Sequence, residues 1–140
     1  MVFVASTVGL ARGFVLAALL LPLLATCTPK ALTDSLSNKS SSQLWTGTAS
    51  VYSRKFEGRL TTSGATFRHR KLTGAHKSLP MGTRVKVTNL KLQCSVEVLI
   101  NDRLPAASPH LIDLSRTAAK QIALPVDGIG KVRVEVVSLP

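Results

Sequence analysis

The stretch CSVEVLINDRLP (residues 94–105) alternates apolar and polar side chains and then enters an irregular segment that contains proline. Successive side chains of a strand point to opposite faces, so Val96, Val98 and Ile100 would share one face of a β-strand. The same alternation occurs in RVKVT (84–88), KVRVEVV (131–137) and TASVYS (48–53). Asn89 to Gln93 is a predicted turn between two paired strands. The pattern predicts a mainly β domain.

A single helix is predicted from Asp113 to Leu124. Asp113 or Ser115 can cap its first turn, TAAKQIAL (117–124) supplies helix-forming residues, and Pro125 ends it. Five or six short strands and one helix in about 95 residues favour a small closed β-barrel. A parallel α/β architecture is disfavoured, because it needs a helix at nearly every crossover.

The length of 140 residues allows one small domain with tails. Residues 13–25, GFVLAALLLPLLA, form an apolar run after Arg12 that Pro22 interrupts. A membrane-spanning helix needs about 20 apolar residues, whereas the apolar part of a secretory signal needs about 7–15. We therefore predict a signal peptide over residues 1–27 and export from the cytoplasm. Residues 28–44, rich in Ser, Thr, Lys and Asn, are predicted to be a flexible tether before a domain at 45–140.

The residues LATC (24–27) resemble a bacterial lipobox, in which the cysteine is acylated and anchors the protein to a membrane. Thr26 departs from that pattern, which prefers Gly, Ala or Ser before the cysteine. The alternative is ordinary signal cleavage nearby, with a Cys27–Cys94 disulfide permitted in an oxidising compartment. The predicted location is the bacterial cell envelope, as a lipoprotein if Cys27 is acylated and otherwise as a periplasmic or secreted protein.

The chain carries 18 Lys and Arg residues against 7 Asp and Glu residues, and only Arg12 among the basic residues precedes residue 28. This balance indicates an anion or an anionic polymer as partner. Nucleic acid is not predicted, because Trp45 and Tyr52 are the sole Trp and Tyr and would offer few stacking platforms. The sequence has no metal-ligand spacing and no phosphate-binding glycine loop, so neither a metal nor a cofactor is predicted.

Among the seven carboxylates, Asp102 is the best candidate for chemistry, because it follows a buried strand and precedes an irregular loop. Each of the other six carboxylates has a predicted structural place. Asp34 lies in the tether, Glu57 and Asp127 lie in turns, and Asp113 lies at the helix start. Glu97 and Glu135 lie between inward-facing valines and therefore face solvent. His76 lies between apolar positions and a turn. Taken alone, it is better explained as a core histidine than as a catalytic one.

Several motifs in order resemble the double-psi β-barrel domain of the rare lipoprotein A (RlpA) family over about residues 47–137. They are GTASVYSRKFEGRLTTSGATF (47–67), LTGAHKSLPMGTRVKVTNL (72–90), VLINDRLP (98–105), IDLSRTAAKQIAL (112–124) and GIGKVRVEVV (128–137). The resemblance implies a six-stranded double-psi barrel with one or two short helices. It also implies a lytic transglycosylase that cleaves peptidoglycan glycan strands, prefers strands lacking stem peptides, and works beside cell-division proteins.

The domain is also similar to expansins and barwin-like proteins, which bind or loosen walls, often without cleavage. This similarity implies the alternative of a non-catalytic peptidoglycan-binding module. The family's catalytic aspartate and histidine correspond to Asp102 and His76, but the place of a usual glutamate is taken by Ala65. Leu104 stands where the family usually has glycine. The missing carboxylate is the main support for the alternative.

In lytic cleavage a carboxylic acid protonates the glycosidic oxygen, and its carboxylate then removes the proton of the C6 hydroxyl, which leaves a 1,6-anhydro-muramoyl end. We expect Asp102 to perform both steps, with His76 orienting the substrate or donating to the developing alkoxide. This requires a raised pKa at Asp102, which the Arg103 guanidinium would oppose if it folded back. The residues expected to contact the glycan are Tyr52, Arg59, Lys77 and Arg103.

Overall fold

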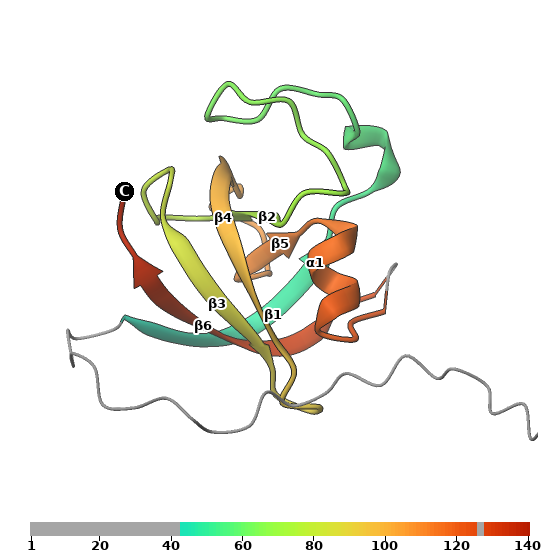
Figure 1. Ribbon diagram of the computed structural model, residues 1–140, viewed down its shortest axis with the longest axis vertical. Coiled ribbons are helices and arrows are strands. Elements are labelled where there is room, and N and C mark those ends of the chain that lie inside the picture. Colours follow the sequence, from blue (N-terminus) through green and yellow to red (C-terminus); the bar gives the residue numbers. More distant parts are fainter. Residues whose placement is uncertain (1–42, 126–127) are drawn as a thin grey trace, which may run out of the picture.

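The computed structural model describes residues 43–125 and 128–140, in which six strands form a closed β-barrel (Figure 1). The strands are β1 (Leu44–Val51), β2 (Thr73–His76), β3 (Arg84–Asn89), β4 (Ser95–Arg103), β5 (Ile112–Leu114) and β6 (Gly130–Ser138). A short 3₁₀-helix, η1 (Arg54–Phe56), and one α-helix, α1 (Arg116–Gln121), complete the domain. The predicted mainly β fold with one or two short helices is confirmed.

The order of strands around the barrel is β1-β5-β2-β4-β3-β6. β1 pairs with β5 and β2 pairs with β4 in parallel, whereas the remaining neighbours are antiparallel. The first and last strands close the barrel, from Leu44 opposite Glu135 to Ala49 opposite Gly130. Because parallel neighbours cannot be joined by a tight turn, the chain crosses the barrel ends repeatedly, as a double-psi barrel requires.

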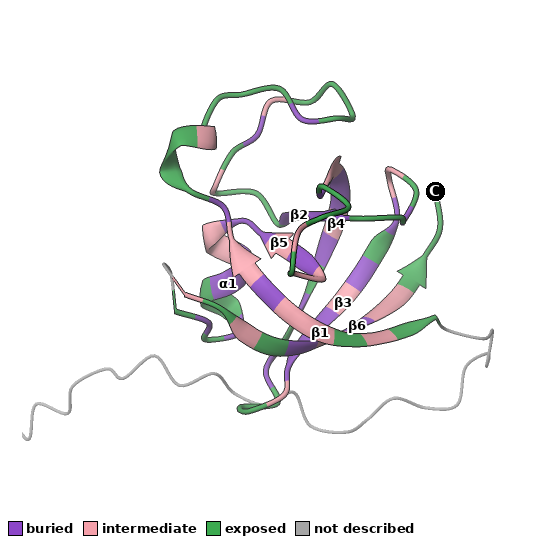
Figure 2. Cartoon of the chain, turned by 180° about the vertical axis from the view of Figure 1, so that it is seen from behind, coloured by how far each residue is buried: buried purple, intermediate pink, exposed green. Residues whose placement is uncertain are grey.

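The interior is filled by the alternating apolar residues of the strands. Val85, Val87, Val98, Val132 and Val134 are at most 2% exposed. Figure 2 shows buried positions alternating with exposed or half-buried ones from Arg84 to Val87 of β3, whereas β1 has half-buried or exposed positions around its buried residue, Ala49. The face of each strand predicted to point inward is therefore confirmed, and the barrel interior is a packed apolar core.

The helix is shorter than predicted, and of the two predicted caps, Asp113 and Ser115, the structure has the second. Asp113 lies in β5, opposite Ser50 of β1 and Ala75 of β2, so its backbone belongs to the sheet. Ser115 is the N-cap, and its hydroxyl accepts a hydrogen bond from the Ala118 amide. The prediction that the helix starts at Asp113 was wrong, because two strand neighbours hold that residue in an extended conformation.

The segment between β1 and β2 arches over one end of the barrel, above the ends of β2 and β4 (Figure 1). Within the segment, Leu60 and Thr66 form an isolated antiparallel β-bridge. Tyr52 and Phe67 from this segment form a second apolar cluster with Ala75 and Leu104. This cluster packs the segment against the outer face of the sheet, near the end of β4 where Asp102 lies.

The predicted signal peptide, most of the tether, Cys27, Asp34 and Asp127 lie outside the described residues. β1 begins at Leu44, one residue before the predicted start of the domain. Cys94 is buried beside the start of β4. Within residues 43–125 and 128–140, no helix has the length and apolar character needed to cross a membrane.

Candidate active site

Asp102 lies near the end of β4, opposite Ala75 of β2, and is half-buried. Its carboxylate accepts four hydrogen bonds. Oδ2 accepts from the Tyr52 hydroxyl at 2.7 Å. Oδ1 accepts from the amide and the hydroxyl of Thr62 at 2.9 and 2.7 Å, and from the amide of Arg103 at 2.8 Å. Both oxygens are therefore oriented by groups from two distant parts of the chain.

These contacts correct the expectation that the pKa of Asp102 is raised. Burial alone would raise it, but the hydrogen bonds from Thr62, Tyr52 and the Arg103 amide outweigh burial and lower the pKa below its usual range. The Arg103 guanidinium takes no part, because its Nη1 donates to the carbonyls of His76 at 3.1 Å and Leu79 at 2.8 Å. Asp102 is a carboxylate at neutral pH.

Tyr52 has a different environment from that of an exposed sugar-binding residue. Its side chain is 9% exposed, with the ring centroid 4.4 Å from that of Phe67 and 5.7 Å from that of Phe56. Burial, followed by the hydrogen bond to Asp102, raises the pKa of Tyr52, so the hydroxyl remains a donor. The structure places Tyr52 as a support for Asp102, with little ring surface left for a substrate.

Thr62 was not singled out from the sequence, yet it makes two of the four hydrogen bonds to Asp102. It belongs to a turn in which the Thr61 amide and hydroxyl donate to the Ala65 carbonyl at 2.8 and 2.9 Å. The motif TTSGAT (61–66) indicates the turn itself. It does not indicate the contact between Thr62 and Asp102, because these two residues are 40 positions apart in the sequence. Ala65 is exposed on the same turn, so the position that resembles the family's glutamate lies three residues after Thr62, whose amide and hydroxyl bind Asp102.

His76 is 3% exposed at the end of β2, as a core histidine would be. Its Nδ1 accepts hydrogen bonds from the amides of Ser78 at 3.3 Å and Leu79 at 3.2 Å, so the neutral ring carries its proton on Nε2. Within the described part of the chain, Nε2 has no hydrogen-bond partner. The ring centroid lies 5.5 Å from that of Trp45. His76 thus shapes the turn after β2.

The register brings Asp102 and His76 to neighbouring strand ends but not to the same face. Ala75 is opposite Asp102, and His76 is opposite Arg103. Paired residues share a face and successive residues alternate, so the two side chains point to opposite faces of the sheet. Burial, then the charges of Arg103 and Lys77, lowers the pKa of His76. His76 is neutral at pH 7 and makes no hydrogen bond to Asp102 in the described region.

The basic residues expected to meet the glycan are divided between two environments. Lys77 and Arg59 are exposed, and the Arg59 guanidinium lies 5.6 Å from the centre of the Phe56 ring. Arg103, in contrast, is half-buried and its guanidinium binds two carbonyl groups. Arg59 and Lys77 therefore remain available to an anionic ligand, whereas Arg103 holds the turn after β2.

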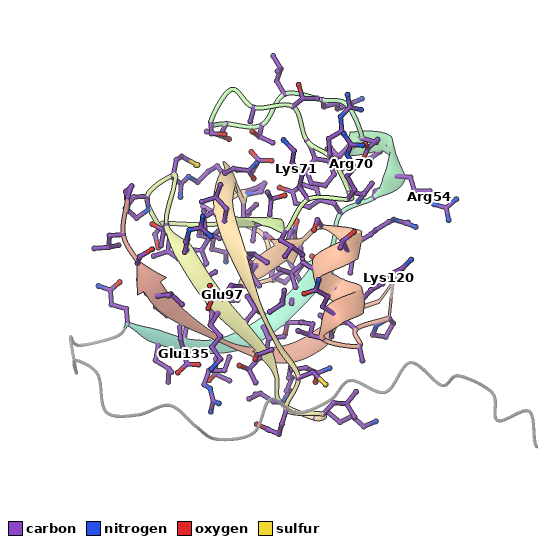
Figure 3. The ribbon with its side chains drawn as sticks, viewed as in Figure 1. Arg54, Arg70, Lys71, Glu97, Lys120 and Glu135 are labelled. Carbon is purple, nitrogen blue, oxygen red and sulfur yellow. The ribbon has the colours of Figure 1, made fainter. Side chains whose placement is uncertain are left out.

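Charge is distributed unevenly over the barrel. Figure 3 shows Arg54, Arg70 and Lys71 around the segment that arches over one end, and Glu97 and Glu135 in the opposite half. Basic side chains therefore lie around the segment that covers the end carrying Asp102, whereas in the opposite half Lys86 is opposite both glutamates and Arg133 forms an ion pair with Glu135. Beside the end that carries Asp102 lies an open pocket of about 490 Å³, lined by Ser50, Val51, Tyr52, Ser53, Arg54, Arg116, Gly128 and Ile129. Over residues 43–125 and 128–140, no group of three or more His, Cys, Asp or Glu side chains is arranged to hold a metal ion.

A sequence model of the family described as "Lytic transglycolase" matches residues 45–134. The chain belongs to the lytic transglycolase family. It is 50% identical over 93 residues to the Endolytic peptidoglycan transglycosylase RlpA of Pasteurella multocida, covering 66% of this chain and 32% of that protein. It is 47% identical over 98 residues to the protein of the same name from Haemophilus influenzae, covering 70% of this chain and 34% of that protein. The chain spans about a third of the length of these curated relatives.

Two solved structures share the fold of this lytic transglycolase domain. The Streptomyces papain inhibitor has a TM-score of 0.53 at 20% identity, covering 69% of this chain and 96% of that chain. The Clavibacter michiganensis expansin has a TM-score of 0.53 at 22% identity, covering 70% of this chain and 52% of that chain. These similarities confirm the double-psi β-barrel, and at such low identity they show the fold alone.

Proposed function

We propose that this protein is a lytic transglycosylase that cleaves peptidoglycan glycan strands, prefers strands lacking stem peptides, and leaves 1,6-anhydro-muramoyl ends. Membership in the lytic transglycolase family and relatives named endolytic peptidoglycan transglycosylases support the reaction class. The observation that carries the proposal is the Asp102 carboxylate, half-buried and oriented by four hydrogen bonds at the end of the barrel that the basic segment covers. A fixed anion at that place is suited to a cationic transition state.

Glycosidic cleavage passes through a transition state that resembles an oxocarbenium ion. In our proposal the ionised Asp102 stabilises this positive charge, because its lowered pKa prevents it from donating a proton near neutral pH. His76 is a positioning residue, since its ring holds the turn after β2 and its carbonyl holds Arg103. Arg59 and Lys77, both exposed, attract the lactyl carboxylates of a strand without stem peptides.

A second candidate is a non-catalytic wall-binding module. The exposed Ala65 supports it, because the turn that supports Asp102 carries no carboxylate at this position. The same barrel and the same basic residues would then hold a glycan strand without cleaving it. Asp102 would in that case bind hydroxyl groups of the sugar.

The two candidates differ in their product. The full-length chain, purified in detergent, is incubated with glycan strands stripped of stem peptides, and new 1,6-anhydro ends are counted by mass spectrometry. The enzyme proposal predicts ends that accumulate with time and fall by about 10²–10⁴ in the Asp102→Asn variant. Equal yields from both proteins would favour the binding module. Ala65→Glu, assayed in parallel, tests whether a carboxylate on this turn raises the rate.

We also propose that the protein acts in the cell envelope and is anchored through an acylated Cys27. The apolar run before Cys27 and the lipobox-like LATC (24–27) support this location, as does a peptidoglycan substrate. Labelled palmitate should be incorporated into the wild-type chain and not into Cys27→Ala. Equal labelling of the two proteins would contradict anchoring at this residue. Cell-division proteins are the proposed partners, and co-purification from cross-linked cells would test this.

A further inference from the structure

The two parallel strands β1 and β5 separate at their carboxyl ends. They run in register up to Val51 and Leu114, and the Tyr52 amide adds one more hydrogen bond to the Leu114 carbonyl. The chain then enters η1 after β1 and α1 after β5. The open pocket of about 490 Å³ described above is lined from both sides, by Arg54 of η1 and by Arg116 of α1. We refer to it as the β1–β5 pocket.

The β1–β5 pocket lies on the same face of the sheet as Asp102. Ser50, which lines the pocket, is opposite Asp113, and the register continues through Ala75 to Asp102. Residues in register share a face, and three strand spacings correspond to about 14 Å along the sheet. Tyr52 connects the two places, because it lines the pocket and its hydroxyl donates to Asp102. A ligand in contact with both must be extended, as a glycan strand is.

The residues of the pocket suit an anionic group that also has apolar parts. Arg54 is exposed on the same side of the barrel as α1 (Figure 3), and its guanidinium takes part in no hydrogen bond or ion pair among the described residues. Ile129, which is 61% exposed, adds an apolar side chain to the lining. No Asp or Glu is among the lining residues that the structure describes. An arginine guanidinium can bind a carboxylate through two parallel hydrogen bonds.

We propose that the β1–β5 pocket binds a muramoyl residue whose lactyl carboxylate is free, and that Arg54 recognises this carboxylate. The inference rests on the glycan ligand of the function proposed above, and it assigns a contact away from the bond that is cleaved. The methyl groups of the same muramoyl residue pack on Ile129. A stem peptide would convert the carboxylate to a neutral amide and add bulk, so the pocket favours strands without stem peptides.

Arg54 differs in its place from the other basic residues proposed to meet the glycan. Arg59 lies over the Phe56 ring and Lys77 directly follows β2, and neither lines the pocket. Exposed charges of this kind attract any polyanion from a distance. Arg54 instead contacts one carboxylate of the bound strand. The proposal therefore predicts a loss of affinity on removal of Arg54 that depends on the presence of that carboxylate.

The test measures the binding of two soluble ligands to the full-length protein in detergent. The first is a hexasaccharide of alternating GlcNAc and MurNAc with free lactyl carboxylates, and the second is the same hexasaccharide with these carboxylates converted to methylamides. All proteins carry Asp102→Asn, so that cleavage does not disturb titration calorimetry. Adding Arg54→Gln should weaken binding of the free-acid ligand about fivefold, as expected for one solvent-exposed ion pair, and leave binding of the methylamide ligand unchanged.

Two further variants separate the pocket from net charge. Ile129→Asp places a carboxylate in the pocket from a part of the chain that is distant in sequence, so it should weaken the free-acid ligand by a similar factor and the methylamide ligand less. Lys91→Gln is the matched control, because it removes the same charge from the exposed turn between β3 and β4, at the other end of β4 from Asp102. It should bind both ligands as the Asp102→Asn protein does.

The inference would be overturned if Arg54→Gln bound the free-acid ligand as tightly as its parent, or lost affinity equally for both ligands. An equal loss in Lys91→Gln would overturn it too, as would an Asp102→Asn protein that does not bind the free-acid ligand. If Arg54→Gln does not fold by circular dichroism, Ile129→Asp decides, and unchanged affinity for the free-acid ligand would overturn the inference. The wild-type protein without anhydro products would overturn the transglycosylase function, while the binding result would still decide the role of the pocket.

Discussion

The hydrogen bond between the Tyr52 hydroxyl and Asp102 provides a quantitative test of how the site is stabilised. Tyr52→Phe removes one donor at 2.7 Å from a charged acceptor and keeps the ring that packs on Phe67. A hydrogen bond to a charged group contributes about 1.5–3 kcal/mol to stability. Because Asp102 is half-buried, water can partly replace the hydroxyl, so we expect a loss of about 1.5 kcal/mol in the free energy of unfolding at pH 7.

The cost should depend on pH in a defined direction. The pKa of Asp102 is lowered in the folded state, so the carboxylate adds stability that is complete above its unfolded pKa of about 3.9. That stability is lost as the pH falls through the folded pKa. Below it, a neutral hydrogen bond of about 0.5–1.5 kcal/mol remains. The difference between wild type and Tyr52→Phe should therefore shrink towards pH 3.

Urea unfolding, followed by circular dichroism at pH 7 and at the lowest pH where both proteins stay folded, gives the two differences. The same substitution is made in an Asp102→Asn background, where the acceptor has no charge, and its cost at pH 7 should be smaller than in the wild type. An equal cost in both backgrounds and at both pH values would show that the Tyr52 hydroxyl stabilises the protein independently of the charge on Asp102. The electrostatic account of Asp102 would then be refuted.

The remaining predictions use other groups of the same region. Tyr52 is the sole tyrosine, and its pKa is raised, so tyrosinate absorbance should stay absent on alkaline titration until the protein unfolds; an early, reversible rise would contradict this. Trp45 is the sole tryptophan and its ring lies 5.5 Å from His76, so protonation of His76 should change tryptophan fluorescence with a midpoint below the usual histidine value, and His76→Gln should remove the transition. Gly74→Ala should cost about 1–3 kcal/mol of stability, because the added Cβ would lie 3.0 Å from the Asp113 carbonyl oxygen; an unchanged melting temperature would contradict this.

The long strands could be predicted from the sequence because each carries its own signal. Valine alternation marks β3, β4 and β6, and the end of that alternation in β4 located Asp102 correctly at a strand end. β2 (Thr73–His76) and β5 (Ile112–Leu114) are too short for a period to be visible. The residues IDLS (112–115) fit a helix start equally well, so Asp113 was assigned to a cap, and its place in a strand opposite Ala75 was missed.

The protonation state of Asp102 could not be predicted, because its donors are distant in sequence. Tyr52 lies 50 residues before it and Thr62 lies 40 residues before it. Arg103, the one charged neighbour visible in the sequence, contributes its amide, while its guanidinium turns to the His76 carbonyl. The local sequence therefore located Asp102 near a strand end, whereas the sign of its pKa shift came from the tertiary fold.

The pairing of β1 with β6 has a consequence for how this protein is made. Leu44 is opposite Glu135, so the barrel joins the two ends of the domain and cannot close before the last strand has been synthesised. Contacts between residues so distant in sequence form slowly, because a long loop must lose conformational entropy before any stabilising contact forms. The domain therefore stays without its closed barrel until its last strand has left the ribosome. That is the state a polypeptide needs if it is to be threaded across a membrane before it folds.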